Sequence, residues 1–267
     1  MISPIYTAVN CRVAYQLNWS LSVFARTALP SADEWLLELK LAVEADGVRI
    51  LSFQHRTENV LQFWLSVQPT VSPSAAIQKV KGRLQYLLRD QIPRLWRRNY
   101  RIESVGDATN RILQSYVKRQ PKRHRLADPR SQSMMENSQF IDETIDLETI
   151  RYSSHGQFVN NLHIVLESAE HLPDIRKDAI STTREMIIRA CRQKHWLLSR
   201  IGVASNHLHL LIGSDVSEVP REIGSSLMNN IAYAHGMKAM FTYSFYVGTF
   251  GNYDRDAIRG VLSQDDS

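Results

Sequence analysis

The sequence predicts an α+β fold in which one domain occurs twice in tandem. Segments with strand and helix periodicity follow the order β-α-β-β-α-β-α up to residue 121, and the same order returns from residue 148. Three landmark pairs keep an offset of 143 to 145 residues: Pro30 with Pro173, Gly106 with Gly251, and Gln120 with Gln264. We therefore expect domains at residues 1–121 and 148–267, each of ordinary domain size.

Start and stop signals define the helices of the first copy. Ser31-Ala32-Asp33-Glu34 has the form of a capping box, which predicts a helix from Trp35 to Asp46 that ends at Gly47. Ser72-Pro73 predicts the start of a second helix, which keeps apolar residues at helical spacing as far as Asp90. Alternation and apolar runs predict the other elements: strands at 15–24, 48–54, 60–67 and 100–105, a turn at Gly106, and a helix at 108–120.

The second copy follows a segment of different composition. Residues 122–147 are rich in charged and small polar residues and show no steady apolar period, which predicts a linker. The segments beyond it repeat the earlier order: strands at 157–166, 196–204, 207–213 and 241–249, a turn at Gly251, and helices at 174–192, from Pro220, and at 254–264.

The composition is that of an ordinary globular protein, with 43% hydrophobic and 22% charged residues among 267. No apolar run approaches the roughly 20 residues of a membrane-spanning helix, and the first ten residues lack the features of a secretory signal. We therefore expect a cytoplasmic protein. Two cysteines, Cys11 and Cys191, are too few for a disulfide framework and are expected to be packing residues.

Basic residues cluster in two places. The net charge is only +5, with a pI near 9.2, but positive side chains gather around Trp96 and Tyr100 and again before residue 124. Such clusters suit phosphate backbones and stacked bases, although a solvated surface has the same composition. The candidate DNA-binding residues are Arg94, Arg97, Arg98, Arg101, Lys118, Arg119, Lys122 and Arg123.

A pair of histidines lies in an apolar run with the length of a strand, Asn206-His207-Leu208-His209-Leu210-Leu211-Ile212-Gly213. Side chains alternate along a strand, so His207 and His209 are expected on the same face. Two neutral imidazoles on one face form half of a site for a divalent metal. The alternative is two surface or packed histidines. His163, on the first strand of the same copy, either reaches this site or packs.

The two copies differ at the positions that carry chemistry. At the histidine strand, the first copy has Val60 and Gln62 where the second has His207 and His209. At the last helix, the first copy has Tyr116 where the second has Gly260. Tyr116 and Gln120 are four residues apart and so share one face of the predicted helix, which lets a phenol and an amide approach one phosphate. The alternative is an amphipathic helix with a half-buried tyrosine and an exposed glutamine.

Taken in order, these motifs resemble the HUH-type single-tyrosine transposases of small insertion sequences and their repeat-associated relatives. The resemblance rests on the Asn-His-Leu-His-Leu-Leu strand, on the Tyr-x-x-x-Gln helix, and on the segments that precede the last helix of each copy, residues 99–106 and 245–251. It implies a ferredoxin-like antiparallel sheet with helices, and a homodimer that acts on single-stranded or hairpin DNA. It also implies Mg²⁺ or Mn²⁺ held by two histidines and a glutamine, and a tyrosine that forms a 5′-phosphotyrosine.

In this chain each copy lacks the half of the site that the other retains. If the fused copies imitate the family dimer with crossed helices, the resemblance implies one composite site of Tyr116 as nucleophile with His207, His209 and Gln120 as metal ligands. The second, degenerate site would contain Val60, Gln62, Gly260 and Gln264. If the helices instead fold back on their own copies, both sites are incomplete.

Three functions follow from these motifs. The first is a metal-dependent transposase that nicks and rejoins single-stranded DNA with one site per chain. The second is a catalytically inactive pseudo-dimer that binds hairpin or single-stranded DNA ends. The third is an RNA-processing protein of tandem ferredoxin-like domains, which leaves the Tyr-x-x-x-Gln motif without a role.

Overall fold

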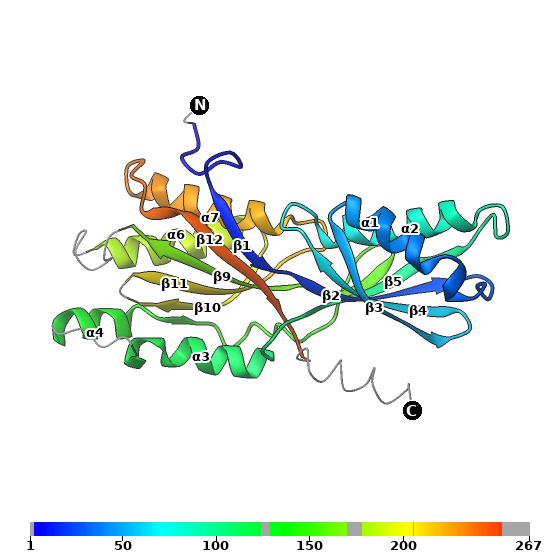
Figure 1. The fold of residues 1–267 in the computed structure, drawn as a ribbon. Coiled ribbons are helices and arrows are strands. Elements are labelled where there is room, and N and C mark those ends of the chain that lie inside the picture. Colours follow the sequence, from blue (N-terminus) through cyan, green and yellow to red (C-terminus); the bar gives the residue numbers. More distant parts are fainter. Residues whose placement is uncertain (1–2, 124–128, 170–177, 205, 253–267) are drawn as a thin grey trace.

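The computed structural model describes residues 3–123, 129–169, 178–204 and 206–252, which form an α+β structure with two six-stranded sheets side by side (Figure 1). The N-terminal sheet has the strand order β3-β4-β2-β5-β8-β7, and the C-terminal sheet has the order β1-β12-β9-β11-β10-β6. The predicted α+β class is confirmed. The helix expected at 254–264 lies outside the described residues.

The first half contributes β1 (Arg12–Gln16), β2 (Asn18–Ala25), α1 (Leu36–Ala45), β3 (Val48–Thr57), β4 (Val60–Val67), α2 (Pro73–Leu88) and β5 (Trp96–Val105). The Ser72 hydroxyl caps α2 by accepting from the Ala75 N–H, as expected for Ser-Pro at a helix start. The expected capping box at Ser31 is not formed: its side chain makes no cap bond, and a short 3₁₀ turn, Ala32–Glu34, precedes α1. Gly47 follows α1 with φ at 82°, which suits glycine.

The second half repeats this order with β8 (Gly156–Val159), β9 (Asn161–Ser168), α6 (Ala179–Gln193), β10 (Leu197–Val203), β11 (His207–Gly213), α7 (Pro220–Ala234) and β12 (Phe241–Phe250). Four strands in each sheet have equivalent neighbours, β5-β2-β4-β3 in one and β12-β9-β11-β10 in the other. These four strands pair antiparallel in both sheets.

Each half also lends a strand to the other half's sheet. The chain bends at Leu17 between β1 and β2 and at Asn160 between β8 and β9. The strand before each bend pairs with the other half: β1 pairs in parallel with β12, and β8 pairs in parallel with β5. The Trp19 indole N–H donates to the Asn160 side-chain oxygen at 3.2 Å, so the two bends are also tied to each other. The halves are therefore joined by backbone ladders and not only by side-chain packing.

The ends of β5 and β12 cross at very short range. The Ser104 and Thr249 hydroxyls each donate to a backbone carbonyl of the other strand, at 2.7 and 2.5 Å. A Cβ at Gly106 would lie 2.2 Å from the Thr249 carbonyl oxygen, and one at Gly251 would lie 2.0 Å from the Ser104 carbonyl oxygen. These glycines, expected to be turn residues, are instead required because two backbones meet there.

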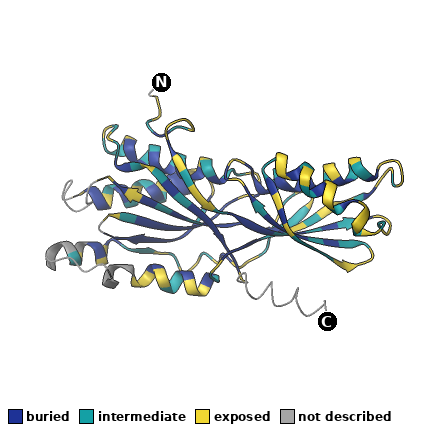
Figure 2. Cartoon of the chain, in the orientation of Figure 1, coloured by how far each residue is buried: buried dark blue, intermediate teal, exposed yellow. Residues whose placement is uncertain are grey.

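Helices cover the two sheets unequally. In Figure 1, α1 and α2 lie over one face of the N-terminal sheet, and α6 and α7 lie over the same side of the C-terminal sheet. Two further helices, α3 (Asn110–Arg123) and α4 (Pro129–Asn137), lie beneath the C-terminal sheet. As a result the four inner strands of the C-terminal sheet, β9 to β12, are buried over most of their length, whereas the N-terminal sheet has many partly exposed residues (Figure 2).

Residues 122–147, expected to be a linker, contain structure in their described part. They include the end of α3, all of α4, and β6 (Phe140–Ile141), which pairs with β10; the short β7 (Arg151–Tyr152) follows. Met135 is fully buried, and the Gln139 side chain exchanges hydrogen bonds with the Val203 backbone at 3.0 Å. Buried side chains, including Met135 and Leu147, and the Gln139 amide anchor this segment, and they do not form an apolar period in the sequence.

Both cysteines are free and buried, as expected for packing residues. Burial raises the pKa of the Cys191 thiol to about 12, so it is not a nucleophile near neutral pH. None of the described helices is long and apolar enough to cross a membrane.

Candidate functional site

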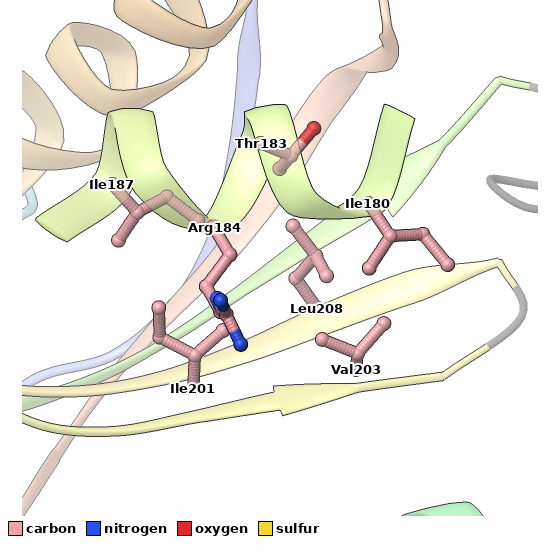
Figure 3. Close-up of a pocket in the computed structure, with 7 residues that line it drawn as sticks. All are labelled: Ile180, Thr183, Arg184, Ile187, Ile201, Val203 and Leu208. Carbon is pink, nitrogen blue, oxygen red and sulfur yellow. The ribbon is translucent and has the colours of Figure 1, made fainter. Parts of the chain in front are cut away.

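The histidine pair lies on β11 in the middle of the C-terminal sheet. Strand β11 covers His207–Gly213, as the sequence predicts, and is paired on both sides, with β9 and β10. Leu208 points toward α6, where it lines a small hollow with side chains of that helix, among them Ile180 and Ile187 (Figure 3). By strand alternation His207 and His209 point to the opposite face, which is the face covered by α3.

Three imidazoles form a cluster on this face. The rings of His207 and His209 lie edge to face with centroids 4.8 Å apart. His163 on β9 stacks against His209 at 5.2 Å, and its Nε2 lies 2.9 Å from His209 Nδ1, within hydrogen-bond distance. Burial lowers the pKa of His163 to about 4, so its ring is neutral near pH 7. His163 therefore reaches the histidine pair and holds one of its rings.

The orientation of His207 is set by its neighbour in the sequence. The Asn206 side-chain oxygen lies 2.8 Å from His207 Nδ1, and an amide oxygen only accepts, so Nδ1–H is the donor. The lone pair of His207 is then on Nε2. A ring held at one nitrogen by a hydrogen bond, with the lone pair on the other, is typical of metal-ligating histidines.

Helix α3 comes from the first half but packs on the sheet of the second. Leu113 and Val117 of α3 form a small apolar cluster with Leu147, Leu211 and Phe250. A Cβ at Gly202 on β10 would lie 2.5 Å from Val117 Cγ1, so glycine lets the helix approach the sheet closely. The helix that carries Tyr116 is therefore held on the half that carries the histidine pair.

Arg200 on β10 provides a polar anchor for α3 that the sequence analysis missed. Its guanidinium group donates to Gln114 Oε1 of α3 at 3.0 Å and to Glu143 at 3.3 Å, while the residue is 7% exposed. A buried guanidinium is stable only where it is paired and hydrogen-bonded. The signal available in the sequence is a single arginine inside the apolar strand run 196–204.

Tyr116 lies beside His209. The two rings meet edge to face at a centroid distance of 5.5 Å and an interplanar angle of 89°, and Tyr116 is 38% exposed. A tyrosine from one half thus contacts the histidine cluster of the other half. The alternative arrangement, in which the described helix α3 folds back on its own sheet, is not the one observed.

Other candidate residues lie as follows. Gln120 is in α3, one turn after Tyr116, with its side chain outside the described residues. Gln62 on β4 is held by hydrogen bonds to Ser20 at 2.6 Å and Arg56 at 2.5 Å. Val60 is the first residue of β4, and His207 holds the equivalent position at the start of β11. Gly260 and Gln264 lie outside the described residues.

The candidate DNA-binding residues fall into two groups. Arg94, Arg97, Arg98 and Arg101 are exposed on β5 or just before it, on the N-terminal sheet. Lys118 and Arg119 are exposed on α3, directly after the turn that carries Tyr116. Lys122 and Arg123 belong to the same helix, with side chains outside the described residues. The positive charge thus lies both beside Tyr116 and on the opposite half of the molecule.

Within the described residues, no group of three or more His, Cys, Asp or Glu side chains is arranged to hold a metal ion. A site that uses His207 and His209 therefore needs a donor of another type, such as an amide, or a group from the substrate. The hydrogen bonds at Nδ1 of both rings fit metal ligation through Nε2.

Comparisons with known proteins point to one family. The family model described as "Transposase IS200 like" matches residues 34–120, from the 3₁₀ turn before α1 to Gln120. This match supports the transposase family for the half that carries Tyr116. A search of curated proteins found no match. Among solved structures, a protein described as a glycine cleavage system transcriptional repressor aligns over 86% of this chain and 96% of its own at 12% identity, with a TM-score of 0.21.

Proposed function

We propose that this protein is a metal-dependent DNA transposase that nicks and rejoins single-stranded DNA at one composite active site per chain. The observation that carries the proposal is the position of Tyr116, on a helix of the first half, beside His209 on the sheet of the second. The family match to residues 34–120 supports the same activity.

Tyr116 is the nucleophile in this proposal. Its phenolic oxygen loses its proton and attacks the scissile phosphorus, while the bond from phosphorus to the 3′-oxygen breaks and that oxygen takes up a proton. The products are a 5′-phosphotyrosine and a free 3′-hydroxyl. Because one phosphodiester replaces another, a second 3′-hydroxyl can reverse the reaction and rejoin the strand. Lys118 and Arg119 lie close enough along α3 to bind phosphates of the cut strand.

His207, His209 and Gln120 are the proposed ligands of Mg²⁺ or Mn²⁺. When bound, such an ion stabilises negative charge on the nonbridging oxygens of the scissile phosphate. The support from this chain is the hydrogen bonding of both imidazoles at Nδ1 and the helical position of Gln120 one turn from Tyr116. His163 and Asn206 orient the two rings.

The architecture supports a pseudo-dimer of two ferredoxin-like domains. The shared strand order, the exchange of β1 and β8, and the crossing at Gly106 and Gly251 relate the halves in the way that two subunits of a dimer are related. In that arrangement a helix that crosses to the other half meets the other half's histidines. The loss of one histidine pair then leaves one complete site.

A covalent protein–DNA adduct tests the activity. Purified full-length protein is incubated with labelled single-stranded oligonucleotides from the ends of its own element, with Mg²⁺ or Mn²⁺ or with a chelator. We expect an adduct that survives denaturation and requires the metal. Binding of the same oligonucleotides with no adduct under any metal condition would favour the inactive DNA-binding pseudo-dimer, which is the second candidate because Gln62 and Val60 replace the first half's histidines.

His163 is expected to influence metal affinity without being a ligand. We expect His163→Leu to weaken Mn²⁺ binding about 10- to 100-fold, measured by calorimetry or electron paramagnetic resonance, because His209 loses the partner of its Nδ1. His163→Gln, which keeps a hydrogen-bonding group, should recover part of the affinity. Tyr246→Phe is the matched control, since the centroid of the Tyr246 ring lies 5.9 Å from that of His163 but on β12, whereas the proposed ligands on β11 lie on the other side of β9. Unchanged Mn²⁺ affinity in His163→Leu would contradict this role.

A further inference from the structure

A hollow lies at the edge of the N-terminal sheet, where the two halves meet. It has a volume of about 570 Å³ and is open to solvent. Its walls come from β5 of the first half and from the β7–β8 hairpin of the second half. The side chains that line it are aromatic, basic or small and polar, and include Phe24, Arg98, Tyr100, Arg101, Tyr152 and His155.

The hairpin that forms one wall is rigidly held against β5. The Ser153 hydroxyl lies 2.8 Å from the Tyr100 hydroxyl, and the Gly156 N–H donates to Ser153 Oγ at 3.1 Å. A Cβ at Gly156 would lie 2.5 Å from the Tyr100 ring, so this position needs glycine. The contacts fix the turn, and with it Tyr152, at the rim of the hollow.

Tyr152 is more exposed than Tyr86, another tyrosine of the surface. It is 73% exposed on the edge strand β7. Tyr86 on α2 is also exposed, at 61%, but the Arg89 guanidinium covers its ring at 4.3 Å. An exposed tyrosine ring on a fixed hairpin is well suited to stack on a flat ligand, because little conformational entropy is lost when it binds.

The charge around the hollow favours an anionic ligand. Arg98 and Arg101 are exposed and line it, and none of its lining residues is acidic. Glu103, the nearest acidic residue along β5, forms an ion pair with Arg101 at 2.5 Å. Arg98 therefore offers a guanidinium group to a ligand in a hollow that is also lined by aromatic rings.

We infer that this hollow binds an unpaired stretch of the DNA substrate, with a base stacked on Tyr152 and a backbone phosphate on Arg98. The inference rests on the proposed function for the identity of the nucleic acid. It adds a binding site on the N-terminal sheet, whereas Tyr116 and His209 lie at the C-terminal sheet, and it gives the N-terminal sheet a role although its histidine pair is lost. Stacking needs an exposed base face, so the site should prefer single strands to duplexes.

Fluorescence anisotropy with a labelled single-stranded oligonucleotide tests the site. All chains carry Tyr116→Phe, so that cleavage does not disturb the measurement. We expect Tyr152→Ala to weaken binding roughly 5- to 100-fold, as for loss of one stacked base, and Tyr152→Trp to retain it. We expect Arg98→Ala to weaken binding and to lower the salt dependence by about one phosphate contact. Tyr86→Ala and Arg89→Ala are the matched controls and should stay within about twofold, because neither lines the hollow.

The outcomes separate this site from the proposed activity. If the parent chain binds the oligonucleotide and Tyr152→Ala and Arg98→Ala bind as tightly as the two controls, the site is overturned whether or not the chain with Tyr116 forms an adduct. If Tyr152→Ala weakens binding while the chain with Tyr116 forms no adduct, the site stands and the proposed activity fails. Equal competition by an unlabelled duplex of the same sequence would overturn the preference for unpaired bases.

Discussion

Replacing Tyr116 with phenylalanine should abolish the covalent adduct, lowering its rate of formation at least about a thousandfold. The substitution removes only the phenolic oxygen, which is the attacking atom in the proposed reaction. The phenylalanine ring keeps the edge-to-face contact with His209, which in the native chain has a centroid distance of 5.5 Å. Loss of the adduct in this variant would therefore be due to the missing nucleophile and not to a change in fold.

Tyr86→Phe is the matched control for this experiment. Tyr86 is an exposed helical tyrosine like Tyr116, but it lies on α2 over the other sheet. Circular dichroism and DNA binding should be the same for both variants. An adduct that persists in Tyr116→Phe would show that another residue is the nucleophile, and peptide mapping of the adduct would identify it.

Gly202→Ala should lower adduct formation by pushing α3 away from the histidine cluster. The new Cβ would lie 2.5 Å from Val117 Cγ1, closer than carbon atoms approach, and either the helix or the strand has to move. Overpacking of this kind costs about 1–3 kcal/mol. Strand β10 is paired on both sides, with β11 and β6, whereas α3 is held by a few side chains, so the helix is expected to move. We expect a loss of about 10- to 100-fold in adduct rate.

A second substitution distinguishes this clash from general damage to the sheet. Val117→Ala removes the methyl group that the new Cβ meets, so Gly202→Ala with Val117→Ala should recover most of the activity lost in Gly202→Ala. Val117→Ala alone should have a smaller effect than Gly202→Ala. If the double variant is no more active than Gly202→Ala, the close approach of α3 to β10 is not what the activity depends on.

The strand and helix order was largely predictable because local signals agree with the tertiary structure. Strand β11 spans the residues expected for it, and Ser72-Pro73 starts α2 as expected. The exceptions have tertiary causes. The first strand of each copy, expected as one strand, is divided at Leu17 or Asn160, because its outer part pairs with the sheet of the other half. Helix α4 has no apolar period to identify it and is anchored by Met135.

For the candidate site, the spacing of His207 and His209 already implies that both rings share one face, because strand side chains alternate. The spacing of Tyr116 and Gln120 likewise places both on one face of a helix, one turn apart. Which sheet that helix covers depends on contacts between residues far apart in the sequence: Val117 against Gly202, and Gln114 against Arg200. Helix α3 has the same local sequence whether it crosses to the other half's sheet or folds back on its own, and the two arrangements differ only in these long-range contacts. The position of Tyr116 beside His209 therefore follows from the way the two halves pack together, and not from the periodicity of either half.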